Sequence, residues 1–106
     1  MRRGVIFLEK LNPRQIDLNL ADLPQWSLNG DALQRTFRFD DFNGSMVFVN
    51  RISDLAEEMH HHPDILIRYN KVTLTLTTHD AGGLTDRDFV FARGTDEASR
   101  REDVKA

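Results

Sequence analysis

The chain has 106 residues, of which 40% are apolar and 29% are charged, and its formal net charge is −3 at pH 7. These values are typical of one folded domain with a single modest core and argue against a wholly disordered chain. A pI near 5.7 argues against a nucleic-acid partner, which would favour a strongly basic surface. The chain has no cysteine, which excludes disulfides, thiolate zinc sites and cysteine nucleophiles.

The N-terminal apolar run, Val5 to Leu8, is interrupted by Glu9 and Lys10. This run is too short for the core of a secretion signal and far too short to span a bilayer. We therefore expect a cytoplasmic protein that does not enter a membrane. Residues 1–11 are expected to form either a tail or an extra strand.

A helix and a hairpin are expected before residue 40. Asn12 and Pro13 favour a helix start, with asparagine as the cap and proline in the first turn, and Pro24 ends the helix. Asn29-Gly30 is a favourable tight-turn pair and predicts a hairpin. The second strand of the hairpin alternates with a period of two, and its apolar face carries Leu33, Phe37 and Phe39.

A long helix is expected next, capped by Asp40 or Asp41. Pro63 ends this helix near His62, because the residue before a proline avoids helical geometry. The apolar stripe that predicts the helix consists of Phe42, Met46, Val49, Ile52, Leu55, Ala56 and Met59.

Two further strands follow the long helix. Residues 65–69 and 72–77 alternate around a turn at Asn70-Lys71, and the later strand has one apolar face and one threonine face. A flexible loop is expected at residues 81–83.

The last expected element is a helix that begins with Thr85 and Asp88, which have the spacing of a capping box. Gly94 is expected to end it, leaving residues 94–106 as a mobile tail and residues 13–92 as the core of one domain. The element order α-β-β-α-β-β-α predicts an α+β fold, with helices packed on one face of a four-stranded antiparallel sheet.

All four histidines lie within one short stretch, as His60, His61, His62 and His79. Imidazole has an ordinary pKa of about 6.5 and exchanges protons near neutrality, so the cluster points to proton transfer or metal binding. A helix rotates by about 100° per residue, which disfavours a metal site made of three consecutive histidines. A metal held by His61 or His62 together with His79 and an acid stays open as an alternative.

Two acids are placed to support proton transfer. Glu57 precedes His61 by four residues, so on a helix the two share a face, and an acid on one ring nitrogen fixes the tautomer. Asp88 lies at a helix start, where the helix dipole favours its ionised form. The ordinary structural alternatives stay open: Asp88 as a helix cap, and Glu57–His61 as a surface pair.

These residues also form an ordered pattern: an acid, three residues, His-His-Pro, an aromatic residue, a Thr-His pair and a closing Arg-Asp. Its places are filled by Glu57, His61, His62, Pro63, Tyr69, His79 and Asp88. Residues 23–26 and 37–42 add the entry to the first strand and to the central helix. Over about residues 13–92 the chain therefore resembles the pterin-4a-carbinolamine dehydratase family.

The resemblance implies a lyase of tetrahydrobiopterin recycling for aromatic amino acid hydroxylation, which dehydrates 4a-hydroxytetrahydropterin to quinonoid dihydropterin without metal or bound cofactor. An acid must protonate the departing hydroxyl and a base must accept a ring proton. On the resemblance we expect the catalytic residues to be His61, His62, His79, Glu57 and Asp88. The expected substrate-binding residues are His61, His62, Pro63, Thr78, His79, Asp80, Ala81 and Arg87.

Within this set, the expected proton carriers are His61, oriented by Glu57, and His79. A solvated surface charge stays open as the alternative for Arg87.

The resemblance also bears on partners. Family members that form tetramers have a longer last helix, so a short helix ending before Gly94 makes a tetramer doubtful. We expect a homodimer paired through residues 73–77 across a two-fold axis. Some relatives act as dimerisation partners of a transcription factor or as assembly proteins, and a non-catalytic or dual-role protein-binding module is the second function class.

Overall fold

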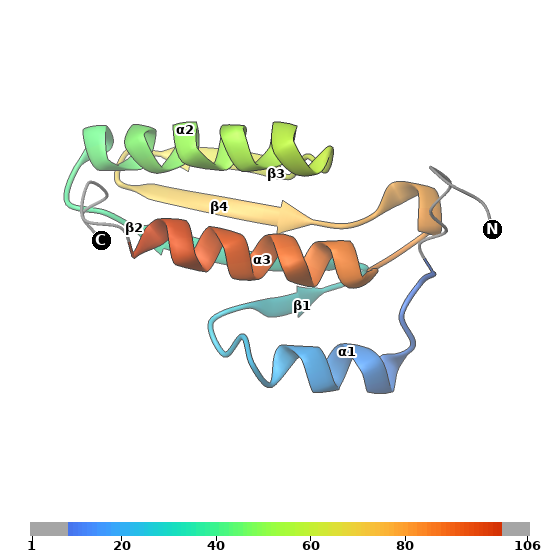
Figure 1. The fold of residues 1–106 in the computed structure, drawn as a ribbon. Helices are drawn as coiled ribbons and strands as arrows, with labels where there is room; N and C mark the ends of the chain where they lie inside the picture. Colours follow the sequence, from blue (N-terminus) through green and yellow to red (C-terminus); the bar gives the residue numbers. More distant parts are fainter. Residues whose placement is uncertain (1–8, 101–106) are drawn as a thin grey trace.

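The computed structural model describes residues 9–100 as α-helices and strands in the order α-β-β-α-β-β-α (Figure 1). The elements are α1 (Pro13–Leu20), β1 (Ser27–Asn29), β2 (Ala32–Arg38), α2 (Phe42–Met59), β3 (Asp64–Arg68), β4 (Lys71–Leu76), the short 3-10 helix η1 (His79–Ala81) and α3 (Asp86–Ser99). The α+β fold predicted from the sequence is confirmed. The possible strand at residues 5–8 and the end of the expected tail lie outside the described residues.

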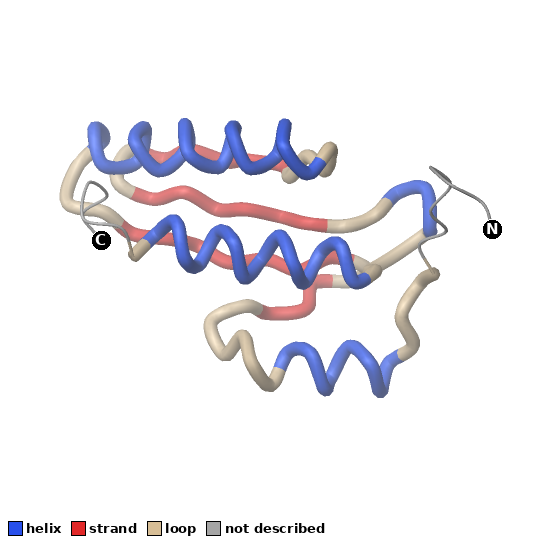
Figure 2. Tube along the Cα trace, in the orientation of Figure 1, coloured by secondary structure: helices blue, strands red, loops and turns tan. Residues whose placement is uncertain are grey.

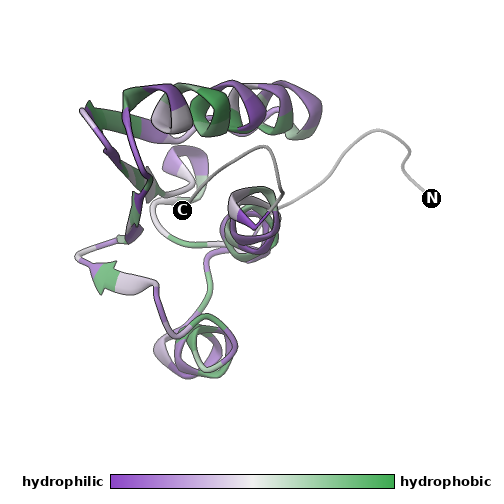
Figure 3. Cartoon of the chain, turned by 90° about the vertical axis from the view of Figure 1, so that its left-hand side faces the viewer, coloured by the Kyte–Doolittle hydropathy of each residue, from purple (hydrophilic) through white to green (hydrophobic). Residues whose placement is uncertain are grey.

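The four strands form one antiparallel sheet in the order β1-β2-β4-β3 (Figure 2). When the sheet is viewed edge-on, the three α-helices lie on the same side of it, as expected (Figure 3). The alternation predicted for β2 and β4 is confirmed, since Leu33, Phe37, Val72, Leu74 and Leu76 are all buried. No helix among residues 9–100 is long and apolar enough to cross a membrane.

The strand order contradicts the expected dimer contact through residues 73–77. β4 lies inside the sheet and pairs with β2 on one side and β3 on the other, so its backbone groups are already used. The edges of the described sheet are β1 and β3 instead.

The apolar stripe predicted for α2 is confirmed at Ile52 and Ala56, which are buried, and at its partly buried members Val49, Leu55 and Met59, but not in the first turns of the helix. Asp41 caps the helix, accepting a hydrogen bond from the Gly44 N–H at 2.8 Å. Phe48 is fully buried, whereas Phe42 is 49% exposed. The run Met46–Val49 is apolar on four consecutive residues, so periodicity alone did not indicate which of them faces the sheet.

Smaller differences concern the first helix and the two turns, of which the second lies at Tyr69-Asn70 and not at the predicted Asn70-Lys71, since Arg68 pairs with Lys71. α1 starts after Asn12 as predicted but ends at Leu20, before Pro24. Asn29 pairs with Ala32, so the hairpin loop is one residue later than predicted, with Gly30 at φ +62°.

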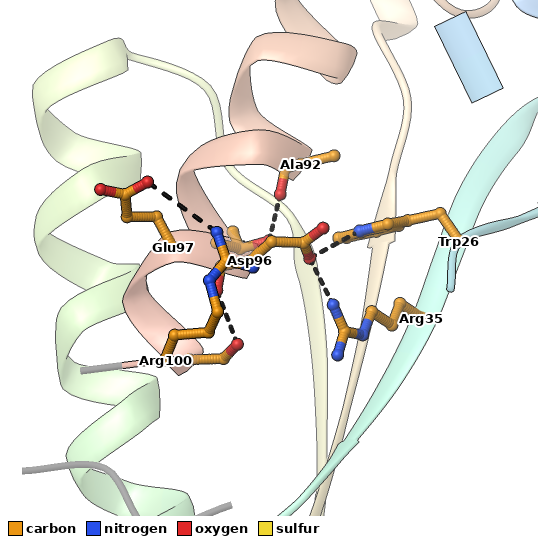
Figure 4. Close-up of polar contacts among 8 residues, drawn as sticks. Trp26, Arg35, Ala92, Asp96, Glu97 and Arg100 are labelled. Atoms are coloured by element: carbon orange, nitrogen blue, oxygen red, sulfur yellow. Dashed lines mark hydrogen bonds and ion pairs between the residues drawn. The ribbon is translucent and has the colours of Figure 1, made fainter. Parts of the chain in front are cut away.

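The expectation that the last helix ends before Gly94 was wrong, because α3 continues to Ser99. Its last turns are fixed to the sheet by Asp96, which accepts hydrogen bonds from Trp26 Nε1 at 2.8 Å and Arg35 Nη1 at 2.6 Å (Figure 4). Gly94 lies where the two long helices approach closely, since a Cβ there would be 2.9 Å from Leu55 Cδ2. A tetramer was doubted because the last helix was expected to be short, and the observed length of α3 removes that reason.

Candidate active site

A polar pocket of about 260 Å³ lies where the end of α2, the end of β4 and the start of α3 meet. It is lined by His60, His61, His62, Thr77, Thr78, His79, Asp80 and Arg87. The fold therefore brings all four histidines to one place, although they come from two segments of the chain.

The end of α2 determines how the three consecutive histidines are presented. His60 adopts the left-handed conformation (φ +52°), and the His61 N–H donates to the Ala56 carbonyl at 3.1 Å. This Schellman-type ending takes the following residues off the helix surface. Helical spacing therefore no longer relates Glu57 to His61.

The expected Glu57–His61 pair was wrong for this reason. Glu57 Oε2 instead lies 2.6 Å from His62 Nε2, and both side chains are largely exposed, at 75% and 62%. His61 turns inward, and its Nε2 lies 2.6 Å from Asp88 Oδ1, with side-chain exposures of 8% and 0%. Of the two imidazole–carboxylate pairs, only the second is sheltered from water.

Asp88 is held by the start of α3. As the capping-box spacing predicted, its carboxylate accepts the Thr85 N–H, at 2.9 Å to Oδ2. The same oxygen accepts the Thr78 hydroxyl at 2.8 Å, and the Thr78 and Thr85 hydroxyl oxygens are 2.9 Å apart. The Thr85 N–H, the Thr78 hydroxyl and His61 Nε2 thus surround a fully buried carboxylate, which leaves neither of its oxygens without a partner.

His79 is held at the pocket by a tight loop. Thr78 and Gly83 exchange two backbone hydrogen bonds, and Gly82 closes the turn with φ +77°. His79 is exposed and, among residues 9–100, its side chain makes no hydrogen bond or ion pair. Its imidazole is therefore available to a ligand.

Most of the predicted site residues meet at this pocket, but not all. Pro63 and Ala81 do not line it, while Glu57 and Asp88 act on its histidines from outside. Sequence reasoning missed His60 and Thr77 as lining residues, although both belong to patterns it had singled out. It also missed the Thr78 and Thr85 hydroxyls, because contacts within a folded core leave no periodic signal.

Among residues 9–100 no group of three or more His, Asp or Glu side chains is arranged to hold a metal ion. The structure therefore offers no such group for the metal alternative based on His61 or His62 with His79.

Fold and site together define an α+β protein whose histidine pocket, backed by a buried carboxylate, is suited to proton transfer. Residues 9–98 match the family described as pterin 4 alpha carbinolamine dehydratase. The relatives include a Thermomicrobium roseum protein, 52% identical over 81% of this chain and 92% of that protein. A Sulfurisphaera tokodaii protein is 44% identical over 85% and 97%. Both are provisionally named pterin-4-alpha-carbinolamine dehydratase, and the chain belongs to this family.

Two solved structures are also similar. A Brucella melitensis protein described as a transcriptional coactivator/pterin dehydratase has a TM-score of 0.82 and 32% identity, covering 85% of this chain and 98% of that one. A pterin dehydratase-like protein described as a RuBisCO assembly factor has a TM-score of 0.60 and 22% identity, covering 73% and 89%. The second likeness shows the fold alone.

Proposed function

We propose that this protein dehydrates a 4a-hydroxytetrahydropterin, such as 4a-hydroxytetrahydrobiopterin, to the quinonoid dihydropterin by histidine acid–base catalysis. The observation that carries the proposal is the buried His61–Asp88 pair in a pocket that His62 and His79 also line. Family membership supplies the substrate class, and the pocket supplies groups that give and accept protons. The product would serve pterin recycling for aromatic amino acid hydroxylation.

The reaction requires two proton transfers. The ring nitrogen next to the hydroxyl-bearing carbon loses its proton, its electron pair forms a C=N bond, and the hydroxyl leaves as water after accepting a proton. A correctly placed acid or base accelerates such a step by roughly a hundred- to ten-thousand-fold. We assign these transfers to His61 and His79, with His62 and its partner Glu57 at the open side of the pocket.

Substrate binding follows from the same geometry. Arg87 and Asp80 line the pocket and offer charged groups to the polar edge of a pterin ring. The Thr78 hydroxyl is already bound to Asp88, and its backbone N–H and carbonyl are bound to Gly83 and Ala81, so Thr78 holds the wall of the pocket and offers no free polar group to the substrate. Pro63 and Ala81 shape the segments beside the pocket rather than its lining.

The test is a stopped-flow ultraviolet assay in which purified protein is mixed with freshly made 4a-hydroxytetrahydropterin, with and without a chelator. The expected result is faster formation of quinonoid product than in the spontaneous reaction, with the same rate in chelator. If the folded protein does not accelerate the formation of quinonoid product, the proposal is contradicted, and a protein-binding role becomes the favoured function.

The expected homodimer has its own structural support, because the sheet edge β3 is open. Its five residues are exposed or half-buried, and Leu66 is 55% exposed. An exposed apolar edge strand offers unpaired backbone groups to another chain. We propose that a second copy of this chain pairs there, giving a homodimer.

The residues of β3 favour a second copy as the partner. In antiparallel pairing about a two-fold axis at Leu66, Asp64 lies opposite the partner subunit's Arg68. Within one chain, Arg38, Lys71 and Arg68 lie side by side in register on three strands. None of the three cations makes an ion pair among residues 9–100. The partner's Asp64 would bring a negative charge to this row.

A further inference from the structure

The buried Asp88 carboxylate fixes where the protons of its neighbours lie. Its Oδ2 accepts the Thr78 hydroxyl proton and the Thr85 N–H. Since the one hydroxyl proton of Thr78 is used in that bond, its oxygen can only accept from the Thr85 hydroxyl, 2.9 Å away. The hydroxyl groups therefore form a chain in one direction, from Thr85 to Thr78 to Asp88.

The position of the ring proton of His61 follows from the same reasoning about donors and acceptors. An ionised carboxylate only accepts hydrogen bonds, so the 2.6 Å contact between Asp88 Oδ1 and His61 Nε2 requires a proton on Nε2. The neutral imidazole then has its lone pair on Nδ1, which makes no hydrogen bond among residues 9–100. The edge-on contact of the His61 ring with Phe91, at 5.9 Å between centroids, further fixes the ring orientation.

We infer that His61 works as the base through Nδ1, and that the hydroxyls of Thr78 and Thr85 are positioning groups that hold Asp88 and thereby the Nε2–H form of His61. The inference deepens the proposed dehydration and rests on it for the reaction, but the position of the proton does not depend on activity. Neither threonine hydroxyl touches the substrate in this account.

The consequence for the reaction is that His61 Nδ1 takes the proton from the ring nitrogen of the pterin. The electron pair of the broken N–H bond forms the C=N bond, and the C–O bond breaks toward the departing hydroxyl. The imidazolium that results has Asp88 directly against its Nε2–H, which stabilises the new charge. The proton for the departing hydroxyl must then come from another group, and His79 lines the same pocket.

The first test observes the proton directly by ¹⁵N NMR of histidine-labelled protein, above the pH at which its imidazoles titrate. The His61 signals are identified by their absence in His61→Gln. The expected spectrum has the proton of His61 on Nε2 and a bare Nδ1, and a proton on Nδ1 would overturn the inference. This readout stands even if the protein proves to have no dehydratase activity.

The second test uses Thr78→Val, which keeps the side-chain shape and removes the hydroxyl. The expected kcat falls by about ten- to a hundredfold with little change in KM, as for other groups that orient a functional histidine. Thr78→Ser should restore most of the kcat and the Nε2–H signal. The matched control is Thr95→Val on α3, which removes another buried hydroxyl, bonded to the Ala92 carbonyl, and should leave kcat within threefold.

Unchanged kcat in Thr78→Val would overturn the positioning role, and so would equal losses in Thr78→Val and Thr95→Val. If Thr78→Val does not fold, Thr85→Ser and Thr85→Val provide the same comparison one step further along the chain of hydroxyls.

Discussion

At the scale of single residues, the two imidazole–carboxylate pairs show that the length of a contact does not determine how much it contributes to stability. Both pairs are 2.6 Å long, but Glu57–His62 is largely exposed, while Asp88–His61 is buried. Exposed pairs contribute little because water competes for both charges. The removal of a buried acceptor leaves its donors without a partner.

Asp88→Asn and Glu57→Gln are therefore matched changes with different expected results. Glu57→Gln should change the free energy of unfolding by less than about 0.5 kcal/mol. Asp88→Asn should lower it by about 1–3 kcal/mol, because an amide cannot accept all three hydrogen bonds. Urea denaturation measures both, and equal values for the two variants would contradict the role given to burial.

His60 carries a second residue-scale prediction, since it is a non-glycine residue in the left-handed region. That conformation costs an L-residue about 1–2 kcal/mol, which a glycine would avoid. Glycine in turn has more conformational freedom to lose on folding, which costs about 0.5–1 kcal/mol. His60→Gly should therefore stabilise the protein by up to about 1 kcal/mol. Glu58→Gly, two residues earlier and still helical, should destabilise it by about 1 kcal/mol. A loss of stability in both variants would contradict this account.

At the scale of elements, local signals could be predicted from the sequence and contacts between distant segments could not. The caps at Asn12 and Thr85 and the alternation of β4 are local, and the structure agrees with them. The extension of α3 past Gly94 depends on Asp96 reaching Trp26 and Arg35, which lie 70 and 61 residues away. A glycine followed by polar residues resembles a helix end unless that contact is known.

For the site, the cluster of histidines and Asp88 were found from the sequence, but the pairing of Glu57 was not. An i, i+4 rule holds only while the helix continues, and the left-handed His60 ends it one residue before His61.

Asp96→Ala tests the anchoring of α3. It leaves the nearly buried Arg35 guanidinium and the Trp26 N–H without their acceptor, so the free energy of unfolding should fall by about 1–3 kcal/mol. Glu97→Ala is the control at the next position, where the contact with Arg100 is 3.9 Å long and exposed, and it should change stability by less than about 0.5 kcal/mol. Chemical denaturation that gives the same midpoint for both variants would contradict the anchoring.

At the scale of the whole molecule, the proposed pairing of β3 predicts a charge dependence of assembly. Arg68→Asp places an acid opposite the partner subunit's Asp64, and should halve the assembly mass measured by light scattering. The exchange Asp64→Arg with Arg68→Asp restores opposite charges and should restore the parent mass. A single variant that keeps the parent mass would contradict pairing through this edge.

The central claim is that the histidine pocket performs the dehydration, and the most direct measurement compares the parent with His61→Ala/His79→Ala in the stopped-flow assay. The parent should form quinonoid product faster than the spontaneous reaction, the double variant should lose that acceleration while remaining folded, and Glu97→Ala should keep it. Activity of the folded double variant within threefold of the parent would contradict the claim.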